Sequence, residues 1–163
     1  RSQDALEAYL HFSALAPNDT AVLEAQRRAD ELFRQVEPGL SEGRRQYFQG
    51  LHLLSLQLPE QAIPMFEQAR TLEPTNTRTH VLIGRAELER NRPEQAIPHF
   101  EAAVKADMNN PLAYYELGHT YDLVGQHDKA RQTWQKLMQV APHSEAAVRL
   151  NTRVDVSTTG MNR

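Results

Sequence analysis

Seven histidines are the side chains of this sequence that could bind a metal or transfer protons. They never form the HExxH pattern of zinc peptidases, and Glu116 and His119 make the one E-x-x-H spacing typical of di-iron bundles. Such bundles need two of these motifs and two further carboxylates. The chain also lacks cysteine, Gly-x-Ser-x-Gly, a phosphate loop and Gly-x-Gly-x-x-Gly. We therefore expect no metal, no cofactor and no catalytic residue, and a binding surface in their place.

The elements that would form such a surface are set by an internal repeat. Residues 59–69 read PEQAIPMFEQA and residues 93–103 read PEQAIPHFEAA, with nine of eleven positions identical at an offset of 34. A period of this length is typical of stacked helical repeats. A looser third copy is in phase with these two. The residues that keep the period are Gly50, Gly84 and Gly118, and the pairs Ala62 with Phe66, Ala96 with Phe100 and Ala130 with Trp134.

These residues resemble the tetratricopeptide repeat family, whose pattern asks for an aromatic residue, Leu-Gly and Tyr, then Ala, an aromatic residue, Ala and Pro. The first copy matches poorly in its first half. The third copy departs only in having Leu for the second Ala: Tyr114, Leu117, Gly118, Tyr121, Ala130, Trp134, Leu137 and Pro142. The resemblance covers about residues 43–142 and implies an all-α fold, a right-handed superhelical solenoid of antiparallel helix hairpins.

We expect repeats at 43–76, 77–110 and 111–143, a degenerate helix hairpin at 1–40, a capping helix at 144–155 and a polar tail at 156–163. An alternative for the first helix is the end of a truncated upstream repeat, because Ala5, Tyr9, Phe12 and Pro17 also fit the spacing. The individual helices are expected at 4–16, 20–36, 41–58, 60–72, 77–89, 94–106, 111–124, 128–140 and 144–154. Asp19 or Thr20, and Ser41, are suitable caps, and Gly125 is placed to end a helix.

The repeated glycines indicate close packing. A glycine costs a helix about 1 kcal/mol relative to alanine, so its recurrence suggests a neighbouring helix that approaches closely. Phe66, Phe100 and Trp134 are then expected in the core. The prolines carry a second signal. Pro59 and Pro93 suit a first helical turn, whereas the prolines five residues later remove a bonded N–H, so we expect a local bend or a late helix start there.

The helix at 41–58 is unusual because its residues from Tyr47 to Leu58 are apolar nearly all round. Such a helix is either buried on more than one side or exposes an apolar surface that favours association with other molecules. The second outcome would favour a self-assembling module.

Composition narrows the class of protein. The 163 residues are 40% hydrophobic and 24% charged, with a formal charge of −3, which fits one soluble domain. No apolar run is long enough for a membrane span, and mild acidity argues against nucleic-acid binding. The composition suits cytoplasm and periplasm alike. The first residue is Arg1, so we expect a piece of a longer polypeptide or a processed form.

In the resembled family, one stripe of each first helix lines a concave groove that binds protein segments. Carried onto this chain, the stripe mixes apolar anchors with arginines, which suits a partner peptide or helix. Its residues are Arg44, Tyr47, Leu51, Leu54 and Ser55; Arg78, Val81, Arg85, Leu88 and Glu89; and Leu112, Tyr115, His119, Asp122 and Leu123. The Lys and Asn residues with which some members hold chaperone tails are absent, so we expect no binding of such tails.

The sequence therefore predicts a non-catalytic protein-interaction scaffold. Two alternatives stay open: a self-assembling structural module that forms homo-oligomers, and a regulatory or substrate-binding segment of a larger enzyme. Fold and function separate widely among such scaffolds.

Overall fold

The computed structural model describes residues 2–15 and 20–151, and within these ranges the chain is helical with no strand. The chain divides into two compact units, residues 1–92 and residues 93–163, each of which is described by itself. The predicted cap at Asp19, the last residues of the predicted capping helix and the predicted tail at 156–163 lie outside the described residues. No helix of the described part is long and apolar enough to cross a membrane.

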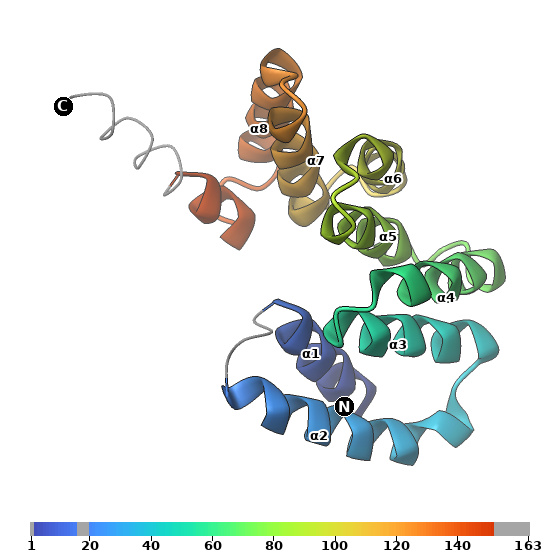
Figure 1. Cartoon of the computed structure of the whole chain (residues 1–163). Coiled ribbons are helices and arrows are strands. Elements are labelled where there is room, and N and C mark those ends of the chain that lie inside the picture. Colours follow the sequence, from blue (N-terminus) through green and yellow to red (C-terminus); the bar gives the residue numbers. More distant parts are fainter. Residues whose placement is uncertain (1, 16–19, 152–163) are drawn as a thin grey trace. The chain divides into compact units, whose positions relative to one another are not determined.

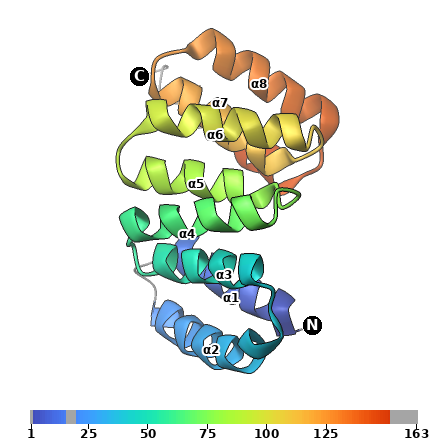
Figure 2. The same ribbon diagram turned by 90° about the vertical axis from the view of Figure 1, so that its right-hand side faces the viewer.

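The described residues of the first unit form five α-helices and one short 3-10 turn. They are α1 (Ser2–Leu15), α2 (Thr20–Val36), η1 (Glu37–Gly39), α3 (Glu42–Ser55), α4 (Pro59–Leu72) and α5 (Arg78–Glu89). Helix α3 pairs with α4, which in turn packs against α5 (Figure 1). Helix α1 packs against α2 and also against α3, where Figure 2 shows it behind that helix. Whether α1 and α2 are a degenerate hairpin or the remnant of an upstream repeat stays a prediction.

The second unit contains α6 (Pro93–Ala106), α7 (Pro111–Leu123), α8 (His127–Val140) and a short helix at 145–151. Helix α7 pairs with α8 and also packs against α6. The short helix contributes Ala147 and Leu150 to a cluster with Tyr114 and Leu137. It packs against apolar side chains of the last hairpin, and its role as a capping helix stays a prediction.

Helix α3 is buried on two sides, which decides between the two outcomes predicted for its apolar surface. Tyr47, Phe48 and Leu51 are at most 1% exposed and belong to a cluster that includes Leu6 of α1 and Phe66 of α4. Two apolar helices thus cover α3 from different sides. The side chains from Tyr47 to Leu54 on this face are therefore not available as a sticky surface, although Leu56 and Leu58 just beyond remain 43% and 37% exposed.

The repeated glycines allow the aromatic residue of the paired helix to approach. A Cβ atom added to Gly50 would lie 2.6 Å from a ring carbon of Phe66, a distance that real Cβ contacts do not show. In the second unit, a Cβ on Gly118 would overlap the indole of Trp134. Phe66 and Phe100 are fully buried and Trp134 is half-buried. The predicted close approach is confirmed at Gly50 and Gly118, and the predicted core role is confirmed for Phe66 and Phe100. Trp134 packs against the apolar cluster of the second unit but is not fully buried.

The prolines at the starts of the second helices behave as predicted, but the later prolines do not delay the helix. Helices α4 and α6 begin at Pro59 and Pro93. Each continues through its second proline, Pro64 or Pro98, so the expectation of a late helix start was wrong. Both later prolines are exposed, so the backbone carbonyl that loses its N–H partner can be solvated by water. A bend there stays a prediction.

Three helices end in the same way, 34 residues apart. Gln57, Asn91 and Gly125 follow α3, α5 and α7 with φ of 58°, 57° and 76°. In each case this residue and the residue after it donate backbone hydrogen bonds to carbonyl groups of the last helical turn. At the end of α3, Gln57 N donates to Leu54 O at 3.0 Å and Leu58 N donates to Leu53 O at 3.0 Å. This is the Schellman arrangement, which satisfies the last carbonyl groups of a helix. The predicted role of Gly125 is confirmed.

Two helices begin at a capping residue, a serine for α3 and an asparagine for α7. The Ser41 hydroxyl accepts a hydrogen bond from Arg44 N at 3.2 Å, as predicted, and Glu42 is in the first turn of α3. Asn110 caps α7 by accepting from Ala113 N at 3.1 Å. These contacts satisfy N–H groups that have no partner within the helix and fix where α3 and α7 begin.

Candidate functional site

The apolar residues of α3 that were expected to face a groove lie in the core of the first unit. Tyr47, Leu51 and Leu54 are at most 1% exposed. They share one cluster with Leu6 and Leu10 of α1, which are themselves at most 2% exposed. The expected apolar binding positions of the first repeat are therefore part of the core of the first unit, to which α1 also contributes.

A carboxylate of α1 is held by two of the predicted groove residues. Tyr47 donates its hydroxyl to Glu7 Oε1 at 2.7 Å, and Arg78 at the start of α5 donates to the same oxygen at 2.6 Å. The side chain of Glu7 is 14% exposed, and that of Arg78 is 65% exposed. Burial and the neighbouring Glu7 carboxylate raise the pKa of Tyr47, so its hydroxyl remains a donor. The same carboxylate raises the pKa of Arg78.

Other predicted positions of the first unit differ in exposure. Arg44, at the start of α3, donates to Gln3 Oε1 of α1 at 3.4 Å and lies 6.0 Å from the centre of the Phe48 ring. On α5, Val81 is only 4% exposed, Arg85 is half-buried and Glu89 is exposed. The charged members of the stripe in this unit thus reach solvent, whereas Ser55 and the apolar residues Tyr47, Leu51, Leu54 and Val81 are buried and Leu88 is half-buried.

In the second unit the predicted stripe on α7 is open. Leu112 is 38% exposed, and Tyr115 and His119 are half-buried. The two rings stack, with centroids 6.4 Å apart and planes inclined by 15°. Asp122, one turn further, lies 2.8 Å from Nδ1 of His127. Because residues three and four apart share one face of a helix, these side chains form one amphipathic strip along α7.

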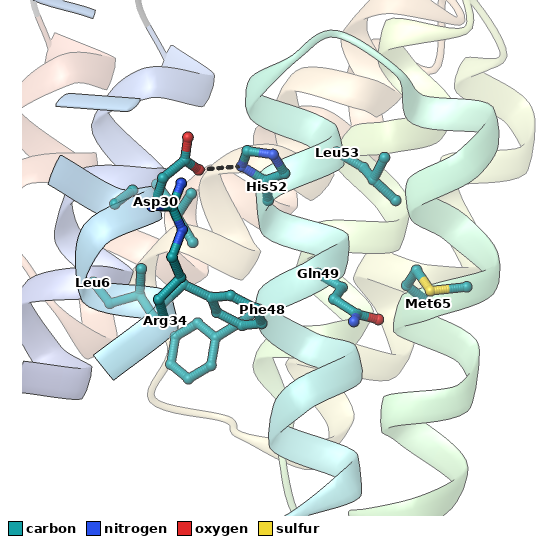
Figure 3. A pocket seen from close by; sticks show the side chains of 11 residues that line it. Leu6, Asp30, Arg34, Phe48, Gln49, His52, Leu53 and Met65 are labelled. Atoms are coloured by element: carbon teal, nitrogen blue, oxygen red, sulfur yellow. Dashed lines mark ion pairs between the residues drawn. The ribbon is translucent and has the colours of Figure 1, made fainter. Parts of the chain in front are cut away.

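A cavity beside α1 was not foreseen from the sequence. It measures about 510 Å³ and lies between α1, α2, α3 and α4. Figure 3 shows Asp30 of α2 and His52 of α3 facing each other at the cavity, 3.6 Å apart. The remaining lining is mostly apolar: Leu6, Leu10, Ala29, Phe33, Arg34, Phe48, Gln49, Leu53 and Met65. One sequence feature could have indicated irregular packing here: Gln49 stands in the first half of the first repeat, where the match to the family pattern is poorest.

A second unforeseen feature lies between α6, α7 and α8. Tyr121 donates its hydroxyl to Glu101 Oε1 at 2.5 Å, and Lys129 Nζ lies 5.2 Å from the centre of the Tyr121 ring. Burial, together with the Glu101 carboxylate, raises the pKa of Tyr121 to about 12. These contacts link α6, α7 and α8. Across the described part of the chain, no three His, Asp or Glu side chains gather in a way that could hold a metal ion.

Paired helices that recur every 34 residues, with a glycine of one helix under an aromatic ring of the other, define a helical-repeat protein. Two tetratricopeptide repeat profiles match the chain, over residues 47–111 and 87–153. The chain belongs to the tetratricopeptide repeat family. A comparison with curated proteins by sequence finds no match.

Solved tetratricopeptide repeat structures share the fold. YrrB, described as a TPR protein with an unusual peptide-binding site, is 21% identical, with a TM-score of 0.64 over 91% of this chain and 84% of that one. MamA is 22% identical, with a TM-score of 0.62 over 76% of this chain and 75% of its own. The TPR domain of Arabidopsis OM64 is 17% identical, with a TM-score of 0.63 over 71% of this chain and 96% of its own. At these identities the likeness concerns the fold.

Proposed function

We propose that this chain is a non-catalytic protein-interaction module that holds a peptide or helix of a partner protein on the exposed strip of α7. The fold supports interaction with proteins in general, since the tetratricopeptide repeat family and its solved members are interaction scaffolds. The peptide-binding site named for YrrB supports a peptide as the kind of partner.

The observation that carries the proposal is the stacked pair of Tyr115 and His119, which lies half-buried beside the exposed Leu112. Aromatic side chains contribute much of the binding energy at protein interfaces, because they bury a large area at small cost in side-chain entropy. Asp122 adds an acceptor at the end of the same strip. A bound segment can therefore bury an apolar side chain against the rings and place a donor next to Asp122.

The test compares the proteins that co-purify with the tagged full chain and with the variant Tyr115→Ala/His119→Ala. A partner that binds the strip is expected to be lost from the variant by about tenfold or more, since interface anchors of this type each contribute about 2 kcal/mol or more. The matched control is Gln132→Ala/Gln135→Ala on α8, where both side chains are exposed. Circular dichroism of each variant verifies the fold.

A partner retained by a correctly folded Tyr115→Ala/His119→Ala variant would contradict the assignment of the strip. Light scattering over a dilution series distinguishes the self-assembling alternative. A complex that contains only copies of this chain, and whose mass falls on dilution, would replace the proposed function by self-assembly.

A further inference from the structure

The cavity of the first unit lies at a junction where two helices stay apart. Farther along the chain, α4 packs closely against α5, and α6 against α7. Helix α2 stands in the corresponding place before α3, but it has few close backbone contacts with that helix. Long side chains link the two instead, as where Gln26 Nε2 donates to Ser55 O at 3.2 Å. This separation accounts for the cavity of about 510 Å³.

The sequence gives a reason for the open junction. One and two periods after Gln49 stand Ile83 and Leu117, and both of these apolar side chains are buried. Gln49 itself is half-buried and lines the cavity. Burying an amide without hydrogen-bond partners is unfavourable, so Gln49 cannot make the contacts that isoleucine and leucine make in the later repeats. The cavity is therefore a property of this one junction.

The cavity is apolar at its inner end and charged at its mouth. Leu6 and Phe48 are fully buried and form part of the inner lining. The side chains of Asp30 and His52 are 46% and 39% exposed, and Arg34 is exposed. Figure 3 shows Asp30 and Arg34 on α2 opposite His52 on α3. A mostly apolar cavity of this size with a few polar groups is typical of a small-molecule site, and its polarity suits an amphipathic molecule.

The charges at the mouth favour an anionic head group. The Asp30 carboxylate is directed to the imidazole, with Oδ1 3.6 Å from Nδ1 of His52. Arg34 lies one turn further along α2, on the same face as Asp30. Among the residues whose side chains the structure describes, Arg34 has no ion-pair partner. A guanidinium can hold a carboxylate by two parallel hydrogen bonds, so Arg34 is suited to receive one.

We propose that this cavity binds a small apolar molecule with one carboxylate, of the chemical class of a medium-chain fatty acid. The hydrocarbon chain lies against the apolar lining, and the carboxylate accepts hydrogen bonds from Arg34. The bound molecule supplies dispersion contacts between α2 and α3 that their own side chains do not make. The inference does not depend on the proposed partner binding, because the strip on α7 belongs to the other unit.

The test titrates decanoate, below the concentration at which it forms micelles, into the full chain with labelled methionine methyl groups. Met65 lines the cavity and is the one methionine of residues 1–92, whereas Met108, Met138 and Met161 belong to the second unit. NMR should show a saturable shift of the Met65 signal alone. The midpoint of thermal unfolding should rise with decanoate concentration. The absence of a saturable Met65 shift, or equal shifts of all four signals, would overturn the inference.

Two further ligands test the two parts of the proposed chemistry. Hexanoate has the same head group and a shorter chain, so it should bind at least about tenfold more weakly because it buries fewer methylene groups. Decyltrimethylammonium has a chain of the same length and the opposite charge, and it should also bind at least about tenfold more weakly. Affinity equal to that of decanoate for either ligand would contradict the proposal.

Variants at the mouth test the sign of the charge. Arg34→Gln should weaken decanoate binding about tenfold. The matched control is Arg27→Gln, which is exposed on the same helix outside the lining and should change affinity less than about twofold. Asp30→Asn should leave affinity unchanged or raise it, because it removes a negative charge near the carboxylate. Equal effects of the two arginine substitutions, or a tenfold loss in Asp30→Asn, would refute the anionic head group.

A variant inside the cavity tests the place of the hydrocarbon chain. Leu53 is half-buried and lines the cavity, so the larger side chain of Leu53→Trp should weaken decanoate binding at least about tenfold. Leu56→Trp, at an exposed residue outside the lining, is the control and should bind as the unchanged chain does. If circular dichroism shows that Leu53→Trp does not fold, Leu53→Phe replaces it. Unchanged binding by the folded variant would contradict the proposed site.

Discussion

The ring of Phe66 lies directly against the backbone of Gly50, so that a Cβ atom at Gly50 would lie 2.6 Å from the ring. We predict that Gly50→Ala lowers the free energy of unfolding by about 1–2 kcal/mol, because overpacking costs about 1–3 kcal/mol and alanine returns about 1 kcal/mol of helix propensity. Chemical denaturation measures the change. The control is Gly39→Ala, where no atom lies within 4 Å of the new Cβ; its effect should stay within about 0.5 kcal/mol.

The opposite sign is predicted at the end of α3. Gln57 has φ of 58°, in the left-handed region that costs a side chain about 1–2 kcal/mol. Gln57→Gly should therefore raise the free energy of unfolding by about 0.5–1 kcal/mol, less than the full strain because glycine gains entropy in the unfolded chain. Gly125→Ala, at φ of 76°, should lower it by about 1 kcal/mol. A loss of stability in Gln57→Gly would mean that the amide side chain makes a compensating contact.

Alkaline pH should destabilise the second unit through Tyr121. Its pKa is raised to about 12 in the folded state, against about 10 in the unfolded chain. The unfolded chain therefore releases this proton first, so the contribution to stability is complete below pH of about 10 and is lost as the pH rises towards 12. Thermal denaturation in this window should show a steeper loss for the unchanged protein than for Tyr121→Phe.

Glu101→Gln provides the control for this pH effect. Removing the carboxylate leaves burial as the main cause of the raised pKa of Tyr121, so the loss above pH 10 should be intermediate between those of the unchanged protein and Tyr121→Phe. Identical slopes for all three proteins would show that Tyr121 ionises equally in the folded and unfolded states.

Much of the fold follows from the sequence because its determinants are local. The 34-residue period, the close approach of the paired helix at Gly118, the first-turn prolines at Pro59 and Pro93 and the end of α7 at Gly125 are all set by neighbours within one hairpin. The expectation of a late helix start at Pro64 and Pro98 was wrong, because α4 and α6 can lose one backbone hydrogen bond in an exposed first turn and still begin at Pro59 and Pro93.

The candidate site was less predictable because it depends on contacts between distant parts of the chain. The apolar surface of α3 indicated burial on more than one side, yet nothing in the pattern selected α1 as the second cover. Glu7 and Arg78 are 71 residues apart in sequence, and Glu7 belongs to no motif. The contact of Tyr47 with Glu7 of α1 therefore had no local signal, whereas the open strip on α7 follows from the third repeat, which fits the family pattern best.

The contact between Glu7 and Tyr47 is the basis of the account of α1, and a double-mutant cycle tests it most directly. The free energy of unfolding is measured for the unchanged chain, Glu7→Gln, Tyr47→Phe and the double variant. We predict a coupling energy of about 1–2 kcal/mol, as expected for a hydrogen bond to a charged group in a partly buried place. Additive effects, with a coupling energy below about 0.5 kcal/mol, would contradict the seating of α1 on α3.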